Sequence, residues 1–145
     1  MNNFHIQLFF PAFALVILTI FILFNMGFRR FKAAKSRKVD INYYKLYRDT
    51  DGSEPENIRK LSRNFQNLFE TPIHFYLAVV LTMILNIESS VFLYTAWIYV
   101  VLRYIHSYVH CTSNNVRNRF NVYFASVLVL IAYWITLLIH VVSAM

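Results

Sequence analysis

Residues 4–28 read FHIQLFFPAFALVILTIFILFNMGF and contain no Lys, Arg, Asp or Glu. At 1.5 Å of rise per residue, a helix of this length crosses a hydrocarbon core of about 30 Å. No basic residue precedes the stretch, its apolar run is longer than that of a secretory signal peptide, and no small-residue cleavage site separates it from Arg29. We therefore interpret it as a retained transmembrane helix.

Three further stretches are helical in pattern and mostly apolar, at about residues 56–87, 91–111 and 119–144. Pro72 lies inside the first of these and predicts a kink, because proline cannot donate the helical hydrogen bond. Hydrophobic residues make up 58% of the chain and charged residues 14%, against roughly 45–50% and about 25% in soluble proteins. The sequence therefore predicts an all-α membrane protein, a four-helix transmembrane bundle that forms a single domain over residues 1–145.

The formal net charge is +7, and most of the basic residues lie in the polar segment at residues 29–55. Its basic residues are Arg29, Arg30, Lys32, Lys35, Arg37, Lys38, Lys45 and Arg48. By the positive-inside rule, this loop and the loop before the last helix face the cytoplasm, and both termini lie outside it. Because the basic residues crowd into one loop instead of covering a face, we expect no nucleic-acid partner.

Polar residues form a stripe on the helix expected at 56–87. Arg63, Asn67 and Glu70 stand at positions i, i+4 and i+7, with Gln66 at i+3, so the four side chains share one face. Charged side chains are costly in hydrocarbon, so such a stripe either binds a polar ligand or joins helices through hydrogen bonds. The mixture of both charges with amides, near the cytoplasmic end, favours binding.

A second polar face lies on the helix expected at 91–111, where Arg103, His106 and His110 stand at i, i+3 and i+7. The H-x-x-x-H pair alone is a weak metal motif without a Glu after the first histidine, so we expect no metal site. Either histidine suits hydrogen bonding or proton transfer. Antiparallel packing across the next turn would return Arg119, at the start of the last helix, to these histidines.

Arginines outnumber acids among these positions, since Arg30, Arg63, Arg103 and Arg119 have only Glu70 as a nearby acid. The excess of positive charge predicts an anionic guest, because arginine forks bind carboxylates in bidentate fashion. A peptide-like molecule with two carboxylates and an amine would use several arginines, a glutamate and an amide. Glutathione has these groups.

The segment RNFQNLFETP at residues 63–72 resembles the R-x-x-x-N-x-x-E motif on the second helix of the MAPEG family, the membrane-associated proteins in eicosanoid and glutathione metabolism. The pattern Arg103-x-x-His106-x-x-x-His110, followed by Arg119, is similar to the family's third-helix motif. The resemblance extends over essentially the whole chain and is strongest to a bacterial branch. It implies an integral protein of a bacterial inner membrane, and a homotrimer with glutathione sites between subunits near the cytoplasmic face.

The resemblance also implies roles for individual residues. Arg119 matches an arginine that lies near the glutathione sulfur and favours the thiolate, which makes it the expected catalytic residue. Lipophilic substrates would arrive from the bilayer, where membrane lipids surround the trimer. The residues expected to bind glutathione, as co-substrate, are Arg30, Arg63, Gln66, Asn67, Glu70, Arg103, His106, His110 and Tyr123.

Two functions remain open at this point, ahead of a small transporter or channel, which would need a continuous polar path that the last helix does not offer. One is a microsomal-type glutathione transferase or peroxidase that acts on lipophilic electrophiles or lipid hydroperoxides. The other is a non-catalytic MAPEG-fold membrane protein, a lipid-binding or scaffold protein whose polar stripes are structural. Gln66, His110 and Phe120 differ from residues found in the family's synthases, which argues against prostaglandin synthase activity.

Overall fold

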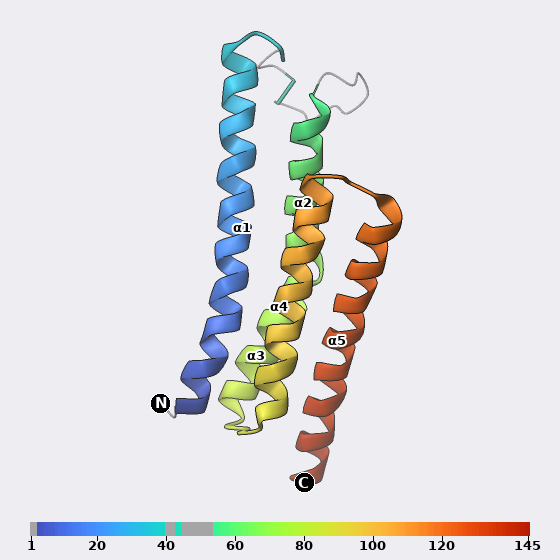
Figure 1. Ribbon diagram of the computed structural model, residues 1–145. Coiled ribbons are helices and arrows are strands. Elements are labelled where there is room, and N and C mark those ends of the chain that lie inside the picture. Colours follow the sequence, from blue (N-terminus) through green and yellow to red (C-terminus); the bar gives the residue numbers. More distant parts are fainter. Residues whose placement is uncertain (1–2, 40–42, 45–53) are drawn as a thin grey trace.

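The computed structural model describes residues 3–39, 43–44 and 54–145. The described residues form the helices α1 (Asn3–Lys35), α2 (Glu56–Glu70), α3 (Pro72–Ile84), α4 (Ser90–Cys111) and α5 (Val116–Ser143). Since α2 and α3 are successive parts of one span, the helices make a four-helix bundle, as the apolar pattern predicts. The N- and C-terminal ends lie at the same end of this bundle (Figure 1).

The break between α2 and α3 occurs at Thr71, directly before Pro72. Proline has no backbone N–H, so the carbonyl four residues earlier, that of Leu68, loses its helical donor. A new helix then begins, with the backbone N–H of His74 donating to the carbonyl of Thr71 at 3.1 Å. The kink predicted from Pro72 is confirmed.

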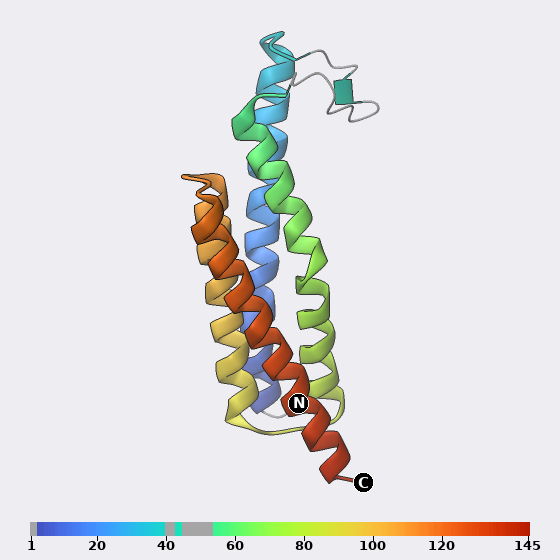
Figure 2. The ribbon, with the colours of Figure 1, turned by 90° about the vertical axis from the view of Figure 1, so that its right-hand side faces the viewer.

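Helix α1 continues past its expected end at Phe28 to Lys35, so the loop expected from residue 29 begins later. The added turns consist largely of Arg, Lys and Ala, which are good helix formers. Lys32 and Lys35 lie in the last turn, where positive charge favours the helix dipole. As a result, α1 and α2 reach beyond the turn that joins α4 to α5 (Figures 1 and 2).

Two other helix ends differ from the prediction for local reasons. Helix α3 ends at Ile84 instead of residue 87, because Asn86 takes a φ of 53° and the N–H of Ile87 returns to the carbonyl of Thr82 at 3.1 Å. Helix α5 begins at Val116 instead of residue 119, because the side chain of Asn115 accepts a hydrogen bond from the N–H of Asn118 at 3.1 Å. The other limits of these helices lie close to the prediction. Helix α4 begins at Ser90, one residue before its predicted start, and α5 ends at Ser143, one residue before its predicted end.

Aromatic side chains hold the interior of the bundle together. Phe75 on α3 stacks on Tyr99 on α4 with ring centroids 4.6 Å apart, and Phe92 meets the ring of Tyr133 on α5 edge-on at 5.0 Å. These four rings are almost completely buried. Because paired aromatic rings add to the free energy of burial, they fix the contact between the three helices.

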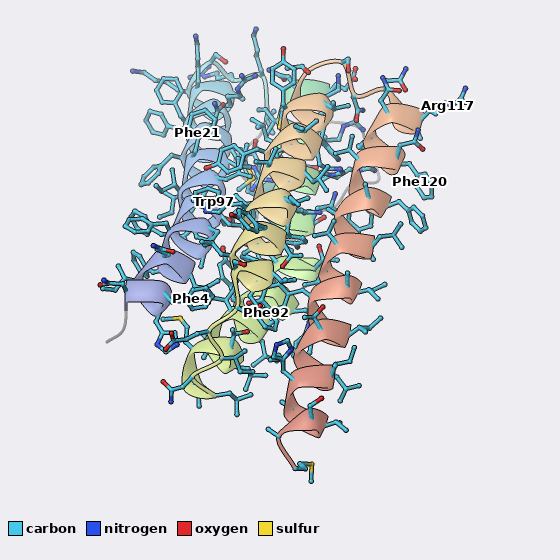
Figure 3. All side chains as sticks on the ribbon, turned by 60° about the horizontal axis from the view of Figure 1, so that its bottom comes forward. Phe4, Phe21, Phe92, Trp97, Arg117 and Phe120 are labelled. Carbon is cyan, nitrogen blue, oxygen red and sulfur yellow. The ribbon has the colours of Figure 1, made fainter. Side chains whose placement is uncertain are left out.

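Apolar side chains also cover the outside of the molecule, as a membrane protein requires (Figure 3). Among the described residues, three helical spans are long and apolar enough to cross a membrane, at Asn3–Lys35, Glu56–Ile84 and Val116–Ser143. Helix α4 is not one of them, because it carries Arg103 and two histidines. These polar side chains are buried against other helices, so α4 packs within the bundle.

Candidate functional site

A pocket of about 440 Å³ opens between α2, α4 and α5, towards the end of the bundle where α4 turns into α5. We call it the polar pocket. Its lining residues are Arg63, Gln66, Asn67, His106, His110, Val116, Arg119, Phe120 and Tyr123. The structure therefore brings seven of the ten residues singled out in the sequence around one hollow.

Helix periodicity explains how each helix contributes to the polar pocket. Residues one turn apart share a face, which aligns Arg63 with Asn67 on α2 and His106 with His110 on α4. The rings of the two histidines have centroids 5.7 Å apart. The tight turn after α4 returns the chain antiparallel, so Arg119 on α5 reaches both histidines, as predicted.

Hydrogen bonds to Arg119 determine which ring nitrogen of each histidine carries the proton. His106 Nδ1 lies 3.2 Å from the carbonyl oxygen of Arg119, which only accepts, so Nδ1 must donate. His110 Nε2 lies 3.3 Å from Arg119 Nη1, which only donates, so Nε2 must accept. In the neutral rings, the other nitrogens are then an acceptor on His106 and a donor on His110.

These other nitrogens, His106 Nε2 and His110 Nδ1, are buried and have no hydrogen-bond partner among the described residues. A buried polar atom without a partner is costly, so His106 Nε2 marks a place where a polar ligand would be stabilising, whereas the His110 ring also interacts with the backbone of Lys60. No group of three or more His, Cys, Asp or Glu within the described part of the chain could hold a metal ion.

Arg103 lies beside the polar pocket and is fully buried. Its Nη2 donates to the carbonyl oxygen of Asn67 at 2.7 Å, and its guanidinium carbon lies 5.5 Å from the centre of the Tyr123 ring. Its Nε and Nη1 atoms have no hydrogen-bond partner, and no carboxylate of the described residues forms an ion pair with it. The carboxylate of Glu70 interacts with Arg103 through charge alone, without a close ion pair, so two buried donors of Arg103 remain for an anionic ligand.

Arg30 and Glu70 lie outside the polar pocket. The Nε of Arg30 forms an ion pair with Glu54 at 2.9 Å, and its Nη2 donates to the hydroxyl of Ser62 at 2.6 Å. This places Arg30 in a neighbouring hollow of about 520 Å³, which shares Arg63 and Gln66 with the polar pocket. The acid close to Arg30 is therefore Glu54, not Glu70 as expected.

Glu70 is the last residue of α2 and is exposed on the surface of the protomer. Glu70 follows Asn67 by one turn of α2, but only Asn67 lines the polar pocket. Within one protomer, therefore, Glu70 does not complete the polar pocket.

Two asparagines at this site, Asn64 and Asn114, were not predicted from the sequence. Asn64 is fully buried, accepts a hydrogen bond from the hydroxyl of Ser107 at 3.2 Å and donates to Cys111 Sγ at 3.4 Å, which ties α2 to α4. Leu61 and Leu68 lie one helical turn before and after Asn64, so the apolar face of α2 could have indicated that Asn64 is buried. The side chain of Asn114 accepts a hydrogen bond from Arg119 Nη1 at 2.6 Å. Asn114 lies in a turn, where no periodic pattern marks it.

Comparison with known proteins adds one finding. The family model described as MAPEG family matches residues 8–139, which includes nearly all of the described helices. No match was found among curated proteins or among solved structures.

Proposed function

The chain belongs to the MAPEG family, a family of membrane proteins in eicosanoid and glutathione metabolism, and we propose that it is a glutathione-dependent transferase or peroxidase. Its substrates would be lipophilic electrophiles or lipid hydroperoxides dissolved in the bilayer. The observation that carries this proposal is the polar pocket, which unites two arginines, two amides and two histidines. No acidic residue of the described chain lines it.

The polar pocket suits a molecule with the groups of glutathione. Its volume of about 440 Å³ falls in the usual range of roughly 300–1,000 Å³ for small-molecule sites. Arg63 offers a fork for a carboxylate, while Gln66 and Asn67 offer amides that pair with peptide groups. Because Arg103 adds a buried cation beside the polar pocket, with Nε and Nη1 lacking hydrogen-bond partners, an anionic ligand would satisfy donors that the described residues leave free.

Arg119 is the residue we assign to activation of the thiol. Its Nη1 contacts the amide oxygen of Asn114 and Nε2 of His110, both neutral, so its charge is not cancelled by these partners. A free thiol has a pKa of about 8.5, and a permanent cation that lowers it by about one unit stabilises the thiolate by roughly 1.4 kcal/mol. More nucleophile is then present at neutral pH.

The lipophilic substrate would approach from α5. Val116 and Phe120 line the polar pocket and are exposed on the outer side of the helix, so an apolar molecule in the membrane meets them first. A thiolate held beside such a molecule gains from orientation as well as from activation. In a transfer reaction, the sulfur forms a bond to an electrophilic carbon and the leaving group departs with the bonding electrons.

Glu70 and Arg30 enter the proposal through assembly. We place them at the contact between subunits of a homotrimer, where an exposed carboxylate on a membrane helix would meet protein instead of lipid. We also assign the basic loop to the cytoplasm and both termini to the outside of a bacterial inner membrane, because Lys and Arg gather at one end.

Ligand binding by the purified full-length protein in mild detergent tests this function. Glutathione and S-hexylglutathione should raise the melting temperature, because they bind the folded state only. Arg63→Ala and Arg119→Ala should weaken binding about tenfold or more, through loss of charge-assisted hydrogen bonds. The matched control for Arg119→Ala is Arg117→Ala. Arg117 is an exposed arginine that also lies on α5 but does not line the polar pocket.

A different result would support the non-catalytic alternative. If glutathione leaves the melting temperature unchanged while Arg63→Ala and Arg119→Ala lower it, the polar pocket is structural and the enzymatic proposal is wrong. If glutathione does bind, two activity assays separate the two reactions. Conjugation of glutathione to a lipophilic aryl halide reports transferase activity, and reduction of a lipid hydroperoxide reports peroxidase activity.

A further inference from the structure

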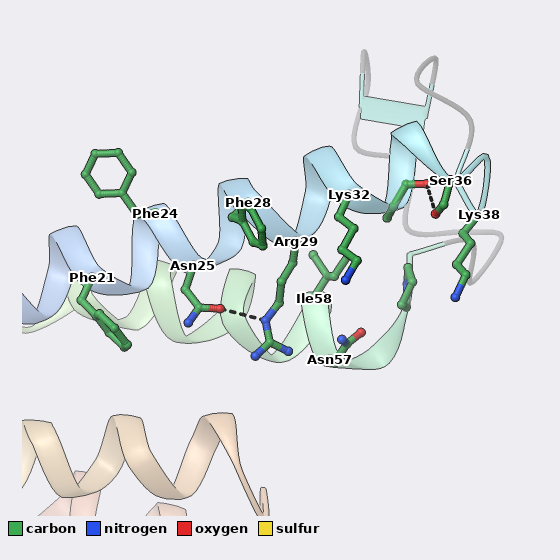
Figure 4. A pocket seen from close by; sticks show the side chains of 12 residues that line it. Phe21, Phe24, Asn25, Phe28, Arg29, Lys32, Ser36, Lys38, Asn57 and Ile58 are labelled. Carbon is green, nitrogen blue, oxygen red and sulfur yellow. Dashed lines mark hydrogen bonds between the residues drawn. The ribbon is translucent and has the colours of Figure 1, made fainter.

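A second hollow, of about 710 Å³, lies between the loop ends of α1 and α2 (Figure 4). It shares no lining residue with the polar pocket, so the function proposed above does not account for it. The lining residues that matter here are Phe21, Phe28, Arg29, Lys32, Lys38 and Asn57. We call it the α1–α2 hollow.

The lining of this hollow changes from aromatic to cationic along α1. Phe21 and Phe28 are 61% and 70% exposed, and Arg29 and Lys32 follow them towards the loop (Figure 4). Phe21 and Lys32 are about 16 Å apart along the helix axis at 1.5 Å per residue. This is the polarity profile of the outer part of a membrane leaflet, with apolar chains below and charged head groups above.

The cationic end of the hollow is not neutralised by the described residues. Arg29 Nε donates to Asn25 Oδ1 at 2.8 Å, a contact that orients the guanidinium without cancelling its charge. No acidic residue of the described segments lines the hollow, and none forms an ion pair with Arg29, Lys32 or Lys38. Arg30, the next residue on α1, differs because it pairs with Glu54.

We propose that the α1–α2 hollow binds one anionic glycerophospholipid from the leaflet that faces the basic loop. The phosphate would be held by Arg29 and Lys32, and the acyl chains would lie along Phe21 and Phe28. Basic pockets between membrane helices hold anionic head groups in this way. A zwitterionic lipid fits less well, since its own cation would meet Lys38, and a free anion would leave the aromatic part of the hollow unused.

The test uses the full-length protein in a neutral detergent, titrated with phosphatidylglycerol or with phosphatidylcholine. Native mass spectrometry counts the bound lipids and thermal unfolding reports their effect on stability. Phosphatidylglycerol should bind and raise the melting temperature more than phosphatidylcholine does. The double variant Arg29→Gln with Lys32→Gln should weaken this binding about thirtyfold, as the loss of two head-group contacts predicts.

The matched control is Lys35→Gln with Arg37→Gln. It removes the same charge from neighbouring exposed positions that do not line the hollow, so phosphatidylglycerol should bind it nearly as well as the wild type. If the first double variant folds poorly, Asn57→Asp offers a second probe. This exposed residue lines the hollow, and a carboxylate there should repel the phosphate while every cation is kept.

Three results would overturn the proposal. Equal weakening by both double variants would mean that lipid responds only to overall charge. Equal stabilisation by phosphatidylcholine would remove the role of the anionic head group. Equal stabilisation by glycerol phosphate, which has the head group without acyl chains, would make the hollow a site for small anions instead of lipid.

Discussion

At the scale of single residues, the polar pocket depends on a cation whose contacts are neutral. Arg119 Nη1 donates hydrogen bonds to Asn114 and His110, and the Arg119 carbonyl oxygen accepts a hydrogen bond from His106. These contacts fix the position of the guanidinium at the start of α5 and leave its charge available. Arg119 is therefore the residue at which the proposed thiol chemistry is most directly tested.

We expect Arg119→Ala to raise the pKa of bound glutathione by about one unit, since a neighbouring cation stabilises the thiolate by about 1.4 kcal/mol per unit of pKa. Less thiolate would then be present at neutral pH, and activity would recover only at higher pH. Ultraviolet absorbance of the thiolate, followed during a pH titration of the complex, measures the change. Arg117→Ala should titrate like the wild type, and an unchanged titration of Arg119→Ala would exclude the assigned role.

Asn64 illustrates a structural residue within a functional stripe. We expect Asn64→Ala to lower the free energy of unfolding by about 1–3 kcal/mol, because the buried hydroxyl of Ser107 loses its acceptor. Glutathione affinity, measured below the melting temperature, should stay near the wild-type value because Asn64 does not line the polar pocket. Asn118→Ala, at an exposed position on α5, is the control for stability.

Loss of glutathione affinity in Asn64→Ala without loss of stability would contradict this division of roles. Residue type alone could not make the division, because Asn64 and Asn67 are both asparagines on one helix. Only the register with Leu61 and Leu68 separates the buried asparagine from the one that lines the polar pocket.

At the scale of helices, a buried hydrogen bond joins α3 to α5. The oxygens of Thr82 and Tyr133 lie 3.0 Å apart, and both side chains are almost fully buried. The single hydroxyl proton of Thr82 is donated to the carbonyl of Ala78 at 2.9 Å, so Tyr133 must be the donor between the two side chains. The two partners are therefore not equivalent.

We expect Thr82→Val to be more destabilising than Tyr133→Phe. Valine has nearly the shape of threonine but leaves the Tyr133 hydroxyl buried without an acceptor, at a cost of about 1–3 kcal/mol. Phenylalanine removes the donor, and the hydroxyl of Thr82 keeps its own acceptor. The expected loss in the free energy of unfolding is about 0.6 kcal/mol, the mean for hydrogen bonds between membrane helices. Reversible unfolding in mixed micelles compares the two variants, and the opposite order would show that Thr82 is the donor to Tyr133.

Helix spans could be predicted from the sequence, but the C-terminal ends of α1 and α3 could not. Long apolar runs and Pro72 locate the crossings and the break, because the bilayer requires satisfied backbone groups over a fixed length. The end of α1 at Lys35 depends on polar residues outside that constraint, where several ends satisfy the same pattern. The end of α3 depends on the positive φ of Asn86, which nothing in the apolar pattern marks.

At the scale of the whole molecule, contacts between distant segments separate what was predictable from what was not. The turn from α4 to α5 is short, so the approach of Arg119 to His110 follows from antiparallel packing. The pair of Arg30 and Glu54 spans a long polar loop, whose closure no periodicity determines. For this reason the sequence predicted most of the polar pocket but not the neighbouring hollow that holds Arg30.

Glu70 provides a test of assembly, because it is exposed on α2 near the middle of the Glu56–Ile84 span. If Glu70 faced lipid, Glu70→Leu would remove a charge from hydrocarbon and stabilise the protomer. If it faces a neighbouring subunit, as we propose, the substitution leaves a polar partner unpaired and weakens the trimer. We expect the wild type, without glutathione, to have three times the chain mass of 17.2 kDa by native mass spectrometry in mild detergent. The Glu70→Leu trimer should dissociate at a lower detergent concentration than the wild type. The control Phe13→Leu, at an exposed apolar position on α1, should not. A more stable Glu70→Leu assembly would show that Glu70 faces lipid.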